Sequence, residues 1–166
     1  GAWLLKHGGS VESIFVERHP KVVQKHSIIL PFRQLTQLRH LELQNVSLSE
    51  KASGPEHQPA GSWADLTALT QLQLEGVNVG AVDSMNSLAA LIGLRNLQLK
   101  GHEIELPRHN GYYIGCYCGE KAGDLTSQSV AKLTALTKLS IKGRSMGQSL
   151  LAAVGTLAQL RALDLE

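Results

Sequence analysis

The chain has 166 residues, the size of about one domain. Its 16 Lys and Arg oppose 14 Asp and Glu, a near-balance that gives little reason to expect a nucleic-acid-binding protein. Hydrophobic residues make up 43% of the sequence and charged residues 18%, so the chain can bury a core. No apolar run approaches the roughly 20 residues that a membrane span needs, so we expect no membrane-embedded segment.

One apolar pattern recurs along the chain. Its N-terminal copy is degenerate and places Val11, Ile14 and Val16 at the spacing that leucines occupy in later copies. Each copy ends in an alternation of apolar and polar residues, which predicts a short strand with its apolar side chains on one face. The predicted strands lie near residues 11–17, 38–44, 69–75, 94–100, 136–142 and 160–166.

The segments between these strands carry Leu, Ala and Val at mixed three- and four-residue steps. Such spacing predicts helical return segments, expected at residues 62–68, 84–91, 127–133 and 148–157. One unit cannot bury its apolar face alone, so neighbouring units must stack. We therefore expect one α/β domain over residues 1–166, a curved solenoid of about six units. A parallel β-sheet would form its concave face, and helical or irregular segments its convex face.

Four copies share most of their apolar positions. The first reads LTQLRHLELQNVSL (35–48) and the second LTALTQLQLEGVNV (66–79). This pattern resembles the leucine-rich repeat LxxLxLxxNxL, and the resemblance covers nearly the whole chain. It implies a horseshoe-shaped solenoid, compatible with a fragment of a longer array. The consensus LTxLxxLxL is most similar to the repeats of intracellular leucine-rich repeat proteins of plants and green algae, including F-box-associated ones.

The copies depart from the family pattern at one position. The Asn of the motif, which hydrogen-bonds the turn backbone along a ladder, is replaced by Val46, Val77, His102 and Arg144. The preceding residues are of types that tolerate a positive φ. We therefore predict that the chain turns by a different route at Asn45, Gly76, Gly101 and Gly143.

Polar residues between the strand leucines should line the concave face, the surface that solenoids most often use for binding. A central column of this face begins at Phe15 and ends at Asp164. A face rich in Gln, Asn and Ser suits hydrogen bonding to a protein or peptide, and it lacks an aromatic platform for stacking bases. The alternative is that these are solvated strand residues. The candidate binding residues are His40, Glu42, Gln71, Gln73, Asn96, Gln98, Lys138 and Ser140.

An insertion interrupts the pattern at residues 105–124, where the step between copies lengthens to 42 residues, from Leu94 to Leu136. It holds all three tyrosines of the chain among glycines, a composition typical of adaptable binding loops. Tyr112, Tyr113 and Tyr117 are therefore further candidates for partner binding. The alternative is that these tyrosines pack back on the solenoid. Residues 49–62 are predicted to form a surface loop.

Cys116 and Cys118 are the only cysteines and stand one residue apart. A disulfide across so short a ring would be strained, so we expect thiols, which fits a reducing compartment. With His102 and His109 a zinc site is conceivable, but the spacing is not that of a standard site, and we predict no metal. No nucleophile–base motif or phosphate-binding loop is visible, so we expect no enzyme and no cofactor.

The expected function is therefore a non-catalytic interaction module, cytoplasmic or nuclear, that binds a protein or peptide through the concave face and the tyrosine loop. The F-box resemblance implies substrate selection for ubiquitin ligation, with ubiquitin-ligase components as partners. One alternative is a fragment of an extracellular receptor that binds a peptide or glycan. Another is a purely structural segment of a solenoid.

Overall fold

The computed structural model describes residues 7–18, 28, 30–46, 48, 62–77, 87–100, 127–142 and 148–166. Several predictions lie outside these residues. They concern the insertion 105–124 with Tyr112, Tyr113, Tyr117, Cys116 and Cys118, the residues His102 and His109, and all but the last residue of the loop 49–62.

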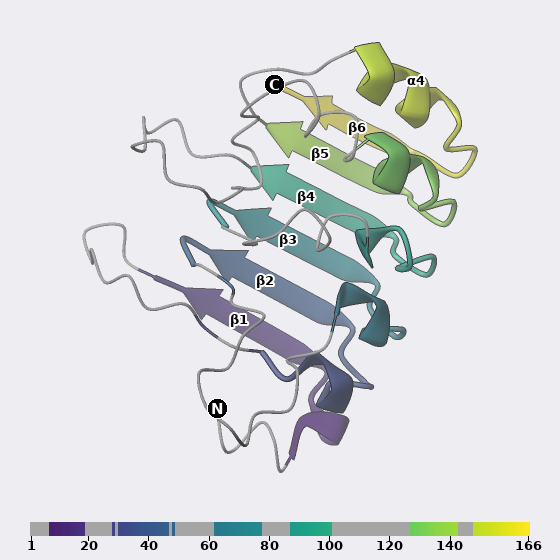
Figure 1. The fold of residues 1–166 in the computed structure, drawn as a ribbon. Helices are drawn as coiled ribbons and strands as arrows, with labels where there is room; N and C mark the ends of the chain where they lie inside the picture. The colour runs from purple at the N-terminus through teal and green to yellow at the C-terminus, as the bar shows by residue number, and fades with distance from the viewer. Residues whose placement is uncertain are drawn as a thin grey trace.

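The described residues form an open, six-stranded parallel sheet, in which every strand pairs with the next one in chain order (Figure 1). All five pairings are parallel and in one continuous register. The parallel sheet expected from the sequence is thus present. The strands are β1 (Ser13–Glu17), β2 (His40–Gln44), β3 (Gln71–Glu75), β4 (Asn96–Lys100), β5 (Lys138–Lys142) and β6 (Ala162–Leu165).

Each strand begins two residues later than the start of its predicted range. The reason is a turn that precedes every strand. Before β2, the Leu38 N–H donates to the Leu35 carbonyl at 3.1 Å, and the Arg39 and His40 N–H groups both donate to the Glu12 carbonyl. Leu38 is fully buried but belongs to this turn, so apolar periodicity alone placed the strand start too early.

The core lies on one side of the sheet. The second and fourth residues of each strand align in register, so that Leu41, Leu72 and Leu97 form one continuous row, and each of these three is at most 2% exposed. Side chains of a strand alternate between faces, so the polar residues between them point the other way. Phe32 and Trp63 belong to the same buried core, and the centroids of their rings lie 5.0 Å apart.

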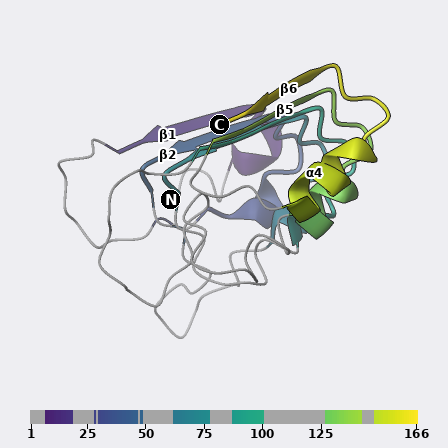
Figure 2. The same ribbon diagram turned by 90° about the horizontal axis from the view of Figure 1, so that it is seen from above.

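The described elements outside the sheet lie on the core side (Figure 2). Three are single 3-10 turns, η1 (Gly8–Ser10), η2 (Phe32–Gln34) and η3 (Trp63–Asp65), and one is the α-helix α4 (Gln148–Gly155). Residues 87–88 and 127–131 are also helical, so α-helical residues occur within three of the predicted return segments. Within the described part of the chain, no helix has the length and apolar character to cross a membrane.

The helical segment predicted at 62–68 is shorter than expected, because its helical part is the single 3-10 turn η3. Ser62 and Asp65 form a reciprocal capping box that starts the turn. Leu66 then leaves the helical region with ψ 56°, while its N–H bonds to the Trp63 carbonyl. A single turn is enough here because it buries Trp63 and Leu66 completely or nearly so.

The ends of β2 and β3 confirm the predicted turns. Asn45 has φ 55° and Gly76 has φ 58°. Their N–H groups donate to the Glu75 carbonyl at 2.8 Å and the Lys100 carbonyl at 2.9 Å. Each turn is thus anchored to the next strand. The valines that follow are buried in the core, so an apolar side chain packs directly after each turn. Gly101 and Gly143 lie outside the described residues.

Candidate functional site

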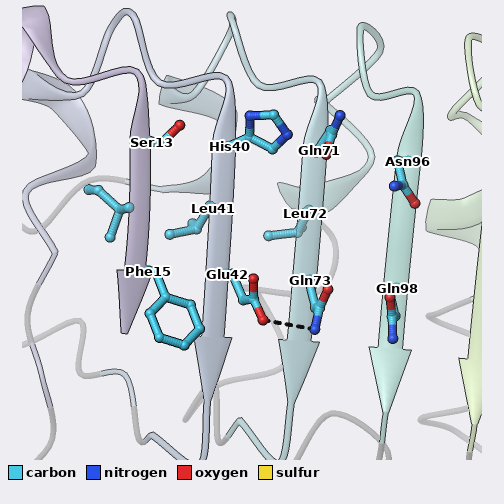
Figure 3. Close-up of a pocket in the computed structure, with 11 residues that line it drawn as sticks. Ser13, Phe15, His40, Leu41, Glu42, Gln71, Leu72, Gln73, Asn96 and Gln98 are labelled. Carbon is cyan, nitrogen blue, oxygen red and sulfur yellow. Dashed lines mark hydrogen bonds between the residues drawn. The ribbon is translucent and has the colours of Figure 1, made fainter. Parts of the chain in front are cut away.

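The face of the sheet opposite the core is called here the open face, and it consists of the first, third and fifth residues of the strands. Over β1 to β4 this face is hollowed into a depression of about 370 Å³ (Figure 3). Ile14, Leu41 and Leu72 also border the depression. Its polar and aromatic lining comprises Ser13, Phe15, His40, Glu42, Gln71, Gln73, Asn96 and Gln98.

Six of the eight residues predicted to bind a partner from the strands line this depression together. They are His40, Glu42, Gln71, Gln73, Asn96 and Gln98. Lys138 is exposed on β5 but does not line the depression. Ser140 is only 4% exposed and donates a hydrogen bond to Asp164 Oδ2 at 3.2 Å. It therefore offers a partner little surface.

Ser13 and Phe15 on β1 also line the depression, although the predicted set of binding residues left both out, and Phe15 is the larger of the two. Phe15 is 59% exposed, although phenylalanine side chains are usually buried. Phe15 sits in the middle of β1 and is the register partner of Glu42 on β2. The sequence signal was its place at the head of the central polar column, in the degenerate first copy of the pattern.

Glu42 organises the amide side chains around it. Its Oε1 atom accepts a hydrogen bond from Gln44 Nε2 at 2.7 Å and another from Gln73 Nε2 at 2.9 Å; Figure 3 shows the second. A carboxylate can only accept, so each glutamine must direct its NH₂ group towards Glu42 and its carbonyl oxygen away. The centre of the depression is therefore rich in hydrogen-bond acceptors.

The ionised groups of the open face are distributed unevenly. Towards the C-terminal strands two lysines are paired with carboxylates: Lys100 Nζ lies 2.7 Å from Glu75 Oε1, and Lys142 contacts Asp164 and Glu166. The hydrogen bond to Glu166, followed by that to Asp164, raises the pKa of Lys142 above its ordinary value of 10.5. Among the described residues, no Lys, Arg or His forms a salt bridge with Glu42.

The polar side chains of this site offer hydrogen-bond donors and acceptors. In the described ranges, no three His, Cys, Asp or Glu side chains come together as a metal site would require. The amides of Gln71, Gln73, Asn96 and Gln98 provide donors and acceptors on the two adjacent strands β3 and β4. The zinc ligands considered from the sequence are not among the described residues.

Comparison with known proteins found no protein-family model and no curated protein that matches this chain. The resemblance to leucine-rich repeats therefore stands on the sequence pattern. A function for the open face has to be inferred from its own geometry and chemistry.

Proposed function

We propose that the chain is a leucine-rich repeat domain that performs no catalysis and binds a protein or peptide partner through the open face. The repeat assignment is supported by a recurring local structure. The turn hydrogen bond seen between Leu38 and Leu35 has counterparts before every strand, for example between Leu69 and Leu66. Stacked units with identical turns and in-register strands are the expected product of a leucine-rich repeat.

The observation that carries the binding role is the polar depression itself. A peptide backbone presents N–H and C=O groups, which the amide side chains of Gln73, Asn96 and Gln98 can satisfy in either direction. The bonds that Glu42 accepts hold Gln44 and Gln73 in place. Side chains already ordered before binding lose less conformational entropy when a partner arrives. The open face corresponds in this proposal to the concave face expected from the sequence.

The cellular role proposed for this module follows the family resemblance. In this role the chain is cytoplasmic or nuclear and selects substrates for a ubiquitin ligase. The polar side chains that line the depression would hold such a partner by hydrogen bonds and ionic contacts. Tyr112, Tyr113 and Tyr117 remain predicted contributors from the insertion.

A second candidate is a structural role, in which the outer edge of β6 joins a larger assembly. One observation favours it: Leu163 occupies a core position of β6 yet is 48% exposed. Exposed apolar surface beside an unpaired strand edge is a typical site of association.

The proposal is tested by affinity capture from the lysate of the source cells, with the purified chain as bait. The test variant carries Glu42→Ala, Gln73→Ala and Gln98→Ala, which remove three polar side chains from the lining of the depression. A matched control carries Lys132→Ala, Gln148→Ala and Gln159→Ala, all exposed and outside the strands. Both variants must show the far-UV circular dichroism spectrum and urea midpoint expected of a folded chain.

A partner lost with the depression variant and kept with the control supports binding through the open face, and recovery of ubiquitin-ligase components supports the specific role. Loss of the same partner with both variants argues against the open face. A chain that captures nothing in either form favours the structural role or a ligand outside the cell.

A further inference from the structure

We infer that the depression recognises an arginine side chain of the partner, with its guanidinium over the ring of Phe15 and its N–H groups directed at Glu42. This inference rests on the proposed function and names the chemical group that the open face selects. It is carried by an exposed ring, an uncompensated carboxylate and oriented acceptor atoms, all brought together on β1 to β3.

The ring of Phe15 supplies the first part of the site. It is well exposed on the hollowed face, so a ligand can reach it. Adjacent strands lie about 4.8 Å apart, and side chains at the same register position are neighbours on one face. Figure 3 shows Phe15, Glu42 and Gln73 in one row across β1, β2 and β3. A planar cation resting on the ring would thus lie beside the carboxylate.

Glu42 supplies the second part. Both hydrogen bonds that it accepts come from neutral amides and fall on Oε1, so they leave its negative charge uncompensated. No described residue donates a hydrogen bond to its Oε2. The open-face positions of β1, β2 and β3 contain no Lys or Arg, and they add the carboxylates of Glu17 and Glu75. Glu75 is paired with Lys100, and His40 is the other titratable side chain that lines the depression.

The arrangement of acceptors favours a guanidinium over an ammonium group. The carbonyl oxygens of Gln44 and Gln73 point away from Glu42, because their NH₂ groups are engaged by it. A guanidinium carries five N–H donors in one plane and can stack on an aromatic ring while donating from its edge. An ammonium group is a compact charge without a flat face, so it cannot stack on the ring and donate to the carboxylate from its edge equally well.

The inference is tested by NMR titration of the full chain, labelled with ¹⁵N and ¹³C. The probes are three acetylated and amidated pentapeptides, Gly-Ser-X-Ser-Gly, in which X is arginine, citrulline or lysine. Citrulline has nearly the shape of arginine but no charge. We expect the arginine peptide to shift the Phe15 ring signals and the side-chain amides of Gln44 and Gln73. The citrulline peptide should bind about fivefold to tenfold more weakly, because it lacks the charge-assisted and cation–π contacts.

Two variants separate the parts of the site, and a third is the matched control. Glu42→Gln keeps the size of the side chain and an acceptor oxygen, and it should abolish the preference for arginine over citrulline. Phe15→Leu should weaken binding of the arginine peptide several-fold. Lys132→Ala changes an exposed residue outside the strands and should leave both the binding of the arginine peptide and its preference over citrulline intact.

The results distinguish this inference from the proposed function. If all three peptides shift the open face equally, or if Glu42→Gln keeps the arginine preference, the inference is overturned while binding through the open face stands. If no peptide shifts any open-face signal, the inference is also overturned. The proposed function is then decided separately by the lysate capture, in which the partner is a whole protein.

Discussion

Leu139 on β5 and Leu163 on β6 face each other at the same register position, but Leu139 is fully buried and Leu163 is 48% exposed. β5 is flanked by β4 and β6, whereas β6 pairs with β5 alone within the described part of the chain. The burial of a strand leucine in this fold thus depends on a neighbouring strand on each side. A parallel stack of this kind gains stability from its interfaces as well as from each unit.

The first prediction compares these two leucines. Leu139→Ala should lower the free energy of unfolding by about 2–5 kcal/mol, because it leaves a cavity in the core. Leu163→Ala should lower it by about 1 kcal/mol or less, since much of that side chain already contacts solvent. Equilibrium urea unfolding followed by far-UV circular dichroism measures both values. Equal losses for the two variants would show that the outer face of β6 is covered in solution.

The second prediction concerns neighbouring residues of β4 that point to opposite faces. Leu97 is 1% exposed in the core, and Leu97→Asp should unfold at least the adjoining units, because it buries an unpaired charge. Gln98 lies on the open face, so Gln98→Ala should leave the urea midpoint nearly unchanged. An unaltered melting curve for Leu97→Asp would contradict the register of the sheet.

The strands and their faces were predictable because a two-residue period has a direct structural meaning. In β2 the alternation of Leu41, Glu42 and Leu43 assigns two side chains to the core and one to the open face. The backbone at Asn45 and Gly76 was also predictable, because few residue types accept a positive φ. These features depend on local sequence, and most of the lining of the depression follows from them.

Other features depend on neighbours that a strand pattern does not specify. Ser140 has a short side chain between the longer Gln98 and Asp164 on the adjacent strands, and its hydroxyl bonds to Asp164. Its position in the pattern predicts exposure, while its size beside those neighbours gives burial. Phe15 shows the reverse. Apolarity alone favours burial, but Phe15 has an odd-numbered position in β1, and among the described strands β1 pairs with β2 alone, so the side chain stays exposed.

The third prediction tests the turn after β3. Gly76 has φ 58°, a conformation in which a Cβ atom meets the carbonyl oxygen that follows, so Gly76→Ala should cost about 1–2 kcal/mol. Gly93→Ala is the matched control. Gly93 has no positive φ, and an added Cβ would lie 4.0 Å from the Thr67 carbonyl oxygen, with nothing closer. The control should change stability by no more than about 0.5 kcal/mol.

Urea unfolding of the two glycine variants provides the measurement. A Gly76→Ala variant as stable as its control would mean that this turn does not hold the left-handed conformation in solution.

The fourth prediction concerns the pH dependence of the ion pairs that join β5 to β6. Lys142 Nζ lies 2.8 Å from Glu166 Oε2 and 3.3 Å from Asp164 Oδ2, and these contacts raise its pKa above 10.5 in the folded chain. Folding therefore favours the protonated lysine. Its contribution to stability is fully present below the unfolded pKa and is lost as the pH rises through the higher folded pKa.

Urea midpoints measured from about pH 8 to about pH 12 test this linkage. Lys142→Met should unfold at a lower urea concentration than the wild type near pH 8, and the gap should close as the pH passes above 10.5. Lys142→Arg serves as the control, because a guanidinium stays protonated across this range. Relative to that variant, the wild type should lose stability at high pH. A gap between wild type and Lys142→Met that stays constant to about pH 12 would show that the contacts with Glu166 and Asp164 do not form in solution, since other titrating groups act on both proteins alike.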